Sequence, residues 1–284
     1  MTVESVTKIE STETVSSTGL PKPYPQLDSN ILNLFLLTGK NAIITGGARG
    51  IGYVVSEAYL QAGLSKLAIM DYDKNDEGID KLKKRFPNSE ITYYSCDVRS
   101  NQQVYDTINT IYESFGTIDV FVANAGIAWT SGALIDPPTD DDWHNVMNVD
   151  LNGVYYCAKI IGQIFKKQQY GSLVMTASMS GHIVNIPQLQ AAYNTAKAGV
   201  VHLGRSLAIE WPWARVNTVS PGYIGTELSD FIAEDMKQKW YSMIPKGRQG
   251  HPRELCGAYL YLASDASTYT TGTDIKVDGG YCAV

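Results

Sequence analysis

The sequence predicts an α/β protein with a doubly wound parallel sheet of about seven strands and helices on both faces of the sheet. Three observations lead to this prediction. Short β-branched apolar runs alternate with longer helical stretches from residue 39 onward. A glycine-rich turn follows the first apolar run. The composition, with 44% hydrophobic and 18% charged residues, is that of a globular domain.

Each expected strand is a short buried run, and the expected helices are longer stretches between strands. The strands are expected at Asn41–Thr45, Lys66–Asp71, Ile91–Asp97, Val120–Asn124, Gly171–Ser178, Arg215–Ser220 and Asp274–Asp278. The helices include Ile51–Ala62, Asn101–Phe115, Asp142–Phe165, Ala191–Glu210 and Arg253–Ser264. Because the strands show little polar alternation, both faces of the sheet are expected to be covered.

The chain has one clear change of composition, near residue 30. Residues 1–30 are rich in Ser and Thr and then in Pro, so a flexible tail is expected, or an arm on a neighbouring subunit. Residues 31–284 are expected to form one domain, because the motifs described below run from Thr45 to Gly280 and leave no room for a second.

Charge and cysteine content narrow the class of protein. The net charge of −6 and the pI near 5.2 argue against a general binder of nucleic acid or of anionic membranes. No apolar run has the length of a membrane span. The four cysteines lack metal-ligand spacing, with each other or with the four histidines. We therefore expect reduced thiols, no metal and a cytoplasmic location.

A dinucleotide site is predicted where the first strand passes into the first helix. Residues 45–52 have the sequence Thr-Gly-Gly-Ala-Arg-Gly-Ile-Gly. In such a loop Gly46 permits the tight turn, Gly50 lets the backbone approach a pyrophosphate, and Gly52 allows close helix–strand packing. The free N–H groups at the start of the helix, around Ile51, then bind phosphate.

Two charged residues bear on the choice of dinucleotide. Asp71 ends the second strand, 19 residues after Gly52, where an acid is placed to bind the adenosine ribose hydroxyl. Its charge would repel a 2′-phosphate, which favours NAD(H) over NADP(H). Arg49 favours the opposite choice, because it lies in the loop and can pair with such a phosphate. We expect NAD(H), with NADP(H) as the alternative.

Six short motifs follow one another along the chain. They are the glycine loop, Cys96-Asp97-Val98, Asn124-Ala125-Gly126, Tyr193-Asn194-Thr195-Ala196-Lys197, Ser220-Pro221-Gly222 and Val277-Asp278-Gly279-Gly280. Together they resemble the short-chain dehydrogenase/reductase family over about residues 36–281. The resemblance implies a single Rossmann-type domain and further cofactor contacts. It implies that Asp97 bonds the adenine, that Asn124 lies beside the cofactor, and that Pro221, Gly222, Ile224 and Thr226 flank the nicotinamide.

A sharper resemblance is to fungal carbonyl, sorbose and mannitol/xylulose-type reductases, through residues 150–156, 182–194 and 221–224. It implies an NAD(P)(H)-dependent oxidoreductase that interconverts a ketose or small ketone and a secondary alcohol or polyol. The alternatives are an epimerase or lyase that recycles its nucleotide, and a dinucleotide sensor without catalysis. The resemblance also implies a homotetramer that uses the Ala191–Glu210 helix and its neighbour, and a substrate loop near residues 225–250.

Tyr193 and Lys197 are the expected catalytic pair. They are four residues apart in a helical stretch and therefore share one helix face. A phenol is a poor base at neutral pH, but a nearby ammonium stabilises the phenolate. Tyr193 can then exchange a proton with a carbonyl or alcohol oxygen. By the resemblance, Lys197 also binds the nicotinamide ribose.

The third catalytic group is expected to be a serine hydroxyl at the end of the fifth strand. Ser178 is favoured because Gly181 follows it by three residues, as in the family, while the usual distance to the tyrosine would select Ser180. The family's fourth catalytic position usually holds an asparagine, and Asp150 occupies it here. Asp150 can accept a bond from a relay water, or it can be a helix residue bonded to nearby backbone.

Several nearby residues have more open roles. His182 lies next to the catalytic strand and can be catalytic, a residue at the pocket rim, or simply packed. Trp129, Tyr155 and Tyr223 can line the pocket or pack in the core. Within the substrate loop, five residues fall at roughly helical spacing and suit either a mobile lid or a surface helix pair. They are Asp230, Phe231, Met236, Trp240 and Met243.

Overall fold

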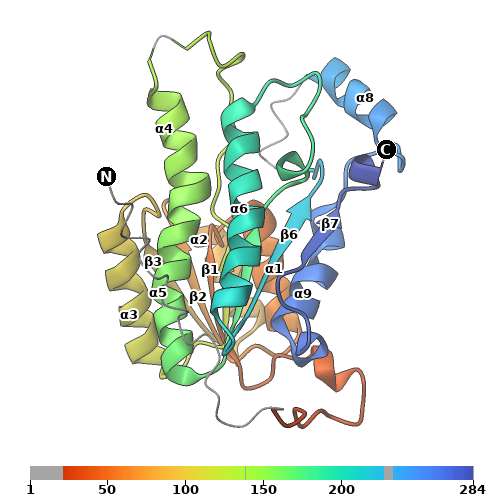
Figure 1. Ribbon diagram of the computed structural model, residues 1–284. Helices are drawn as coiled ribbons and strands as arrows, with labels where there is room; N and C mark the ends of the chain where they lie inside the picture. Colours follow the sequence, from red (N-terminus) through yellow and green to blue (C-terminus); the bar gives the residue numbers. More distant parts are fainter. Residues whose placement is uncertain (1–21, 138, 227–232, 284) are drawn as a thin grey trace, which may run out of the picture.

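The computed structural model describes residues 22–137, 139–226 and 233–283 (Figure 1). In this part of the chain seven strands form one parallel sheet in the order β3-β2-β1-β4-β5-β6-β7. The strands are β1 (Asn41–Thr45), β2 (Lys66–Asp71), β3 (Glu90–Ser95), β4 (Val120–Ala123), β5 (Ser172–Thr176), β6 (Arg215–Pro221) and β7 (Asp274–Val277). The predicted doubly wound α/β fold is confirmed.

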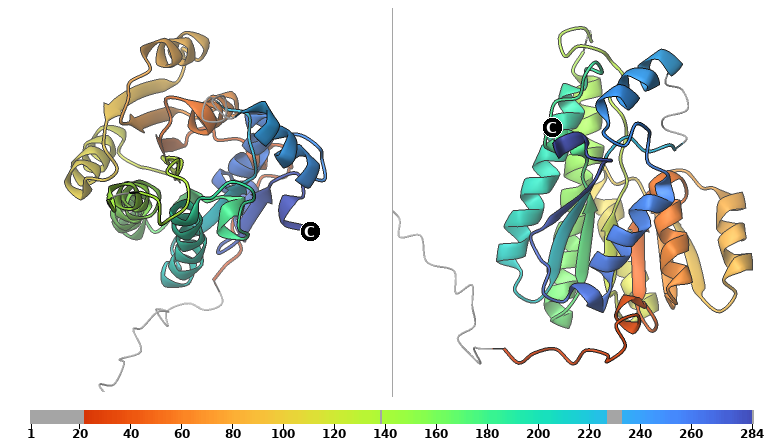
Figure 2. Two further views of the ribbon diagram at one scale, coloured as in Figure 1. Left: turned by 90° about the horizontal axis from the view of Figure 1, so that it is seen from above. Right: turned by 90° about the vertical axis from the view of Figure 1, so that its right-hand side faces the viewer.

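The helices cover the sheet in two layers, as the view from above shows (Figure 2). One layer contains α1 (Gly50–Gln61), α2 (Asp76–Arg85) and α9 (Cys256–Ala263). The other contains α3 (Asn101–Phe115), α5 (Gly153–Gln168) and α6 (Ala191–Glu210). The shorter α4 (Asp141–Met147) precedes α5, and α8 (Glu234–Met243) lies beyond the carboxyl ends of the strands (Figure 1). No helix among the described residues has the length and apolar character needed to cross a bilayer.

The core has two halves, one on each face of the sheet. All five residues of β1 are buried. Ala42 and Ile44 pack toward α1 and α9, whereas Ile43 packs toward α3 and α5. Successive side chains of a strand point to opposite faces, so a continuous apolar run is what a sheet covered on both sides requires. This constraint makes the strands recognisable in the sequence.

The predicted elements agree with the structure to within a few residues, with three differences. The stretch expected as one helix over Asp142–Phe165 is divided into α4, a π-helical segment at Asn148–Asn152, and α5. The helix expected at Arg253–Ser264 is also divided, because Pro252–Leu255 form a 3-10 turn before α9. Helix α2 was not among the predicted helices, although Asn75 caps it by accepting a bond from the Gly78 N–H.

Residues 22–30, at the end of the expected tail, form no regular element until the bend at Ser29 and Asn30. Residues 1–21 of that expected tail lie outside the described part of the chain. The role of this segment as a tail or arm stays a prediction.

Candidate active site

The candidate site lies at the carboxyl ends of the central strands, at the upper end of the sheet in Figure 1. After β1 the chain builds the sheet outward through β2 and β3, and it then crosses back to place β4 on the other side of β1. In α/β proteins ligands bind at such a reversal, near the loops that follow the two central strands, here β1 and β4.

The glycine loop between β1 and α1 needs glycine at three positions. Gly46 has φ +63°, and a Cβ there would lie 2.9 Å from the Ala125 Cα. A Cβ on Gly52 would lie 2.1 Å from the Gly46 carbonyl oxygen, so the start of α1 can approach β1 only without a side chain. Gly50 has φ +55° with no atom within 4 Å of its Cβ position, so open space faces the loop there. These features fit a loop that holds a dinucleotide.

Asn124 fastens the ends of β1, β4 and β5 to one another. Its Nδ2 donates to the carbonyl oxygens of Thr45 and Gly46. Its Oδ1 accepts a bond from the Thr176 hydroxyl. The Thr45 hydroxyl oxygen in turn accepts the Asn124 and Ala125 N–H groups. Thr45 and Thr176 were not predicted as site residues, because a strand-end threonine carries no distinctive signal in a single sequence.

Asp71 is bound within the glycine loop and its neighbourhood. Its Oδ2 accepts from the Ala48 N–H at 3.0 Å, and its Oδ1 lies 3.4 Å from the Asp73 nitrogen. Burial raises the pKa of Asp71, and the bond from Ala48 acts against that rise. Arg49, by contrast, is exposed and forms an ion pair with Asp73 at 3.2 Å.

Asp97 follows β3 and is paired with Arg99. Two guanidinium nitrogens of Arg99 lie 2.7–3.0 Å from the carboxylate, and the bonds from Arg99 lower the pKa of Asp97. Arg99 also donates to the Asn145 Oδ1 and lies over the exposed Tyr72 ring. Arg99 was not among the predicted site residues.

The expected nicotinamide contacts lie at the end of β6. The Gly222 N–H donates to the Val277 carbonyl, and a Cβ on Gly222 would lie 2.6 Å from the Asp278 Cα. Ile224 is buried and forms a backbone bridge with Gly250. Pro221 ends the strand, and Thr226 is the last described residue before the gap at residues 227–232.

Tyr193 and Lys197 lie one turn apart on α6, as predicted. Lys197 is buried, and its Nζ is 5.4 Å from the centre of the Tyr193 ring. The ammonium donates to the Thr176 carbonyl oxygen at 3.2 Å and lies 3.0 Å from the Asp150 Oδ1. Lys197 is therefore held in one position, directly beside the phenol.

Asp150 reaches this cluster from the π-helical segment. In that segment the Gly153 N–H bonds the Asn148 carbonyl, five residues back, which widens the helix where Asp150 is buried. The Asp150 Oδ2 accepts from the Ile127 N–H at 3.1 Å. The predicted alternative of a carboxylate bonded to backbone is thus present, together with an ion pair to Lys197 that was not predicted.

The charges around Tyr193 act in opposite directions. Burial raises the pKa of Tyr193, Lys197 lowers it, and Asp150 raises it. Burial alone would lower the pKa of Lys197, but Asp150 and Tyr193 outweigh this effect and raise it, so the ammonium stays charged. Burial raises the pKa of Asp150, and Lys197 opposes that rise.

The two candidate serines have different environments. The Ser178 side chain lies close enough to Tyr193 to act toward lowering the pKa of the phenol, and its Oγ accepts from the Ser180 N–H at 3.1 Å. The Ser180 Oγ instead accepts from the Gln190 Nε2 at 2.9 Å. The structure therefore brings Ser178 together with Tyr193 and Lys197. Gln190 also contacts Asn185 and Asn194, and sequence reasoning missed this buried amide.

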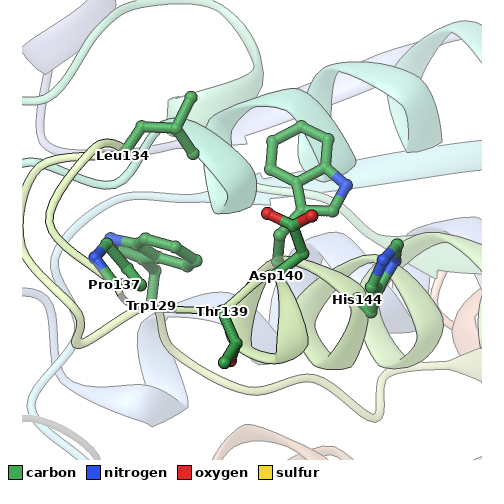
Figure 3. Close-up of a pocket in the computed structure, with 7 residues that line it drawn as sticks. Trp129, Leu134, Pro137, Thr139, Asp140 and His144 are labelled. Atoms are coloured by element: carbon green, nitrogen blue, oxygen red, sulfur yellow. The ribbon is translucent and has the colours of Figure 1, made fainter.

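The aromatic candidates divide between a cavity, a stack and the surface. Trp129 packs beside Tyr193 and helps to line a cavity of about 350 Å³ (Figure 3). The other lining residues are Leu134, Pro137, Thr139, Asp140, Trp143 and His144. Tyr155 is partly exposed on α5, where its ring lies against Tyr156 and not in this cavity.

Helix α8 carries the described part of the expected substrate loop. Trp240 is buried, and its indole stacks on the Tyr223 ring with centroids 4.0 Å apart and planes 9° apart. Met236 and Met243 pack against the apolar cluster that contains Trp240. Asp230 and Phe231 lie outside the described residues.

The chain matches known proteins over most of its length. The family model described as enoyl-(acyl carrier protein) reductase matches residues 46–282. A probable NADP-dependent mannitol dehydrogenase of Yarrowia lipolytica is 57% identical, over 93% of this chain and 95% of the relative. A sorbose reductase of Candida albicans is 53% identical, over 92% and 94%. The crystal structure of an NADPH-dependent 3-quinuclidinone reductase from Rhodotorula rubra has a TM-score of 0.88 and 39% identity, and it covers 94% of this chain and 100% of that one.

The expected preference for NAD(H) is wrong. The mannitol dehydrogenase and the quinuclidinone reductase are named for NADP and NADPH, which contradicts it. The prediction assumed that Asp71 has a carboxylate free to bind a ribose. In the structure this side chain is buried and accepts the Ala48 N–H, so much of its hydrogen-bonding capacity serves the loop.

The predicted family and the predicted oxidoreductase activity agree with these relatives, which include enzymes named for a polyol and for a ketose. The motifs that carry the resemblance, including the glycine loop and the Tyr193–Lys197 pair, are spread along the whole domain. The strand order is that of a doubly wound sheet. The chain belongs to the short-chain dehydrogenase/reductase family and is an oxidoreductase of that family.

Proposed function

We propose that this protein is an NADP(H)-dependent ketose reductase and polyol dehydrogenase, with Tyr193 as the general acid and base. The observation that carries the proposal is the position of Tyr193 directly beside the buried Lys197–Asp150 pair, with the Ser178 hydroxyl at the end of the neighbouring strand β5. Support for the substrate class comes from the relatives named for mannitol and sorbose. The proposal covers a ketone and its secondary alcohol in either direction.

The mechanism follows from what each side chain can do. Ser178 and Tyr193 hydrogen-bond the substrate oxygen and orient the carbonyl. In reduction Tyr193 gives its proton to that oxygen, and Lys197 stabilises the phenolate that remains. A nicotinamide held at this site would supply the hydride in reduction and accept it in oxidation. Asp150 keeps Lys197 charged and in place, and its own charge raises the pKa of Tyr193.

The glycine loop and the ends of the neighbouring strands would hold the dinucleotide. Gly46, Gly50, Ile51 and Gly52 present backbone to the pyrophosphate. Arg49, exposed at the start of α1, would pair with the 2′-phosphate. The remaining proposed contacts are Asp71, Asp97 and Asn124, Tyr193 and Lys197, and Pro221, Gly222, Ile224 and Thr226.

Assembly and location complete the proposal. We propose a homotetramer packed through α5 and α6, supported by the exposed Tyr155 on α5 and the 80% exposed Ile209 on α6. We also propose a cytoplasmic location, because the four cysteines, all within the described residues, form no disulfide. The segment 225–250 is proposed as the substrate loop, and residues 1–30 as a tail or arm.

Replacing Tyr193 by Phe removes the proton donor and should lower the turnover of ketose reduction by about 10²–10⁴-fold. The assay follows NADPH absorbance at 340 nm with L-sorbose and other ketoses. Fluorescence titration should show that NADPH still binds. Tyr105→Phe, a half-exposed tyrosine on α3, is the matched control and should keep wild-type turnover. Full activity in Tyr193→Phe would disprove the assignment.

Replacing Arg49 by Ala should raise the KM for NADPH about tenfold or more, because a charge-assisted hydrogen bond is lost. The KM for NADH should change much less, since NADH has no 2′-phosphate. Arg85→Ala, at the far end of α2, serves as the control. Equal changes in the KM for NADPH and for NADH would show that Arg49 does not bind the 2′-phosphate.

Replacing Asp150 by Asn should move the pH profile. Asp150 raises the pKa of Tyr193, so its neutralisation stabilises the phenolate and lowers that pKa. Reduction needs the protonated phenol, and its fall in rate at high pH should begin at a lower pH. Oxidation needs the phenolate and should gain rate at a lower pH. A profile that stays in place, relative to the exposed control Asp106→Asn, would contradict this role.

Size-exclusion chromatography with light scattering tests the assembly. Four copies of the 31.1 kDa chain should travel together, because the apolar residues on α5 and α6 are buried between subunits. The mass of a single chain at micromolar concentration would exclude the proposed tetramer.

A further inference from the structure

His182 ends the short turn that begins at the catalytic serine. Ser178 caps a 3-10 turn at Met179–Gly181, and His182 follows this turn directly. The His182 Nε2 lies 2.9 Å from the Asp274 Oδ2 and 3.2 Å from the Ser220 Oγ. Because Nε2 already faces these two groups, that atom is not available to a substrate.

Asp274 is the first residue of β7, and its side chain is 6% exposed. Its Oδ1 accepts bonds from the Thr218 and Ser220 hydroxyls of β6, at 2.5 and 2.8 Å. Apart from His182, the buried Oδ2 has no hydrogen-bond partner among the described residues. A buried carboxylate oxygen is costly without a donor, so this contact favours one position of the His182 ring.

The other side of the same turn packs on α6. A Cβ on Gly181 would lie 2.9 Å from the carbonyl carbon and oxygen of Lys197, so the turn touches the helix backbone at the catalytic lysine. The turn is therefore fixed between α6 on one side and β6–β7 on the other. Ser178, at its start, lies where these two contacts meet.

We propose that His182 is a positioning residue whose contact with Asp274 holds the Ser178–His182 turn against β6 and β7 and so keeps Ser178 beside Tyr193. It acts through Ser178 and does not touch the substrate. The inference rests on the proposed function, because Ser178 must orient a substrate oxygen for its position to matter.

The test compares His182→Ala with His182→Gln, which keeps an N–H donor for Asp274. The readouts are kcat and KM for ketose reduction, the Kd for NADPH and the Tm. In His182→Ala the kcat should fall about tenfold or more, since a small misplacement of a catalytic group is enough for such a loss. The Kd for NADPH should stay within about twofold. His182→Gln should recover most of the kcat, and Lys84→Ala, an exposed residue of α2, should behave as wild type.

A double-mutant cycle separates positioning from general stability. If His182 acts through Ser178, then His182→Ala should cost little kcat in a Ser178→Ala background. Three results would overturn the proposal. The first is a wild-type kcat in His182→Ala, and the second is an equal loss of kcat in the presence and absence of the Ser178 hydroxyl. The third is a weaker binding of NADPH and a lower Tm that together account for the fall in kcat.

Two further outcomes stay distinguishable. If His182→Ala does not fold, Asp274→Asn takes its place, because the neutral amide weakens the bond to His182. A lowered kcat with unchanged NADPH binding supports the proposal, and an unchanged kcat overturns it. A wild-type enzyme that turns over no ketose would instead remove the proposed function, before any comparison of variants.

Discussion

The buried ion pair between Lys197 and Asp150 is the interaction on which the site depends. Its two members come from α6 and from the π-helical segment, and each is bonded to backbone of another element, at Thr176 of β5 and at Ile127 after β4. Removing one partner of such a pair costs about 3–5 kcal/mol, because it leaves a buried charge uncompensated. The pair therefore fixes four chain segments around Tyr193 and sets the charge beside its hydroxyl.

A carboxylate at position 150 changes the balance of charge in this cluster. The family resemblance predicts a neutral asparagine at this position, which would place no negative charge beside Lys197 and the phenol. Here Lys197 lowers the pKa of Tyr193 while Asp150 and burial raise it. Keeping the phenol protonated suits the role of proton donor in ketone reduction. Glycine at position 126 belongs to the same arrangement, because a Cβ there would lie 2.7 Å from the Asp150 Oδ1.

The fold was predictable wherever one physical rule dominates, and the site was predictable only in part. Strands β1 and β2 and helix α6 agree residue by residue, since burial on both faces and a clear helical period leave few alternatives. The π-helical segment was not foreseen, because the spacing of apolar residues shows neither the widening of the helix nor the tertiary contact of Asp150 with Lys197. Spacing alone left Ser178 and Ser180 open, and only the folded turn shows that Gln190 occupies the Ser180 hydroxyl. Asp71 misled the cofactor prediction because its bond to the Ala48 N–H is invisible in sequence.

The most direct test of this account is the titration of Tyr193 itself. The ring carbon that bears the hydroxyl can be labelled with ¹³C, its resonance assigned with Tyr193→Phe, and its ionisation followed by NMR over a range of pH. We expect Lys197→Met to move the ionisation of Tyr193 to higher pH and Asp150→Asn to move it to lower pH. A titration that neither substitution moves, or that moves in the opposite direction, would contradict the claim that these two buried charges control the catalytic tyrosine.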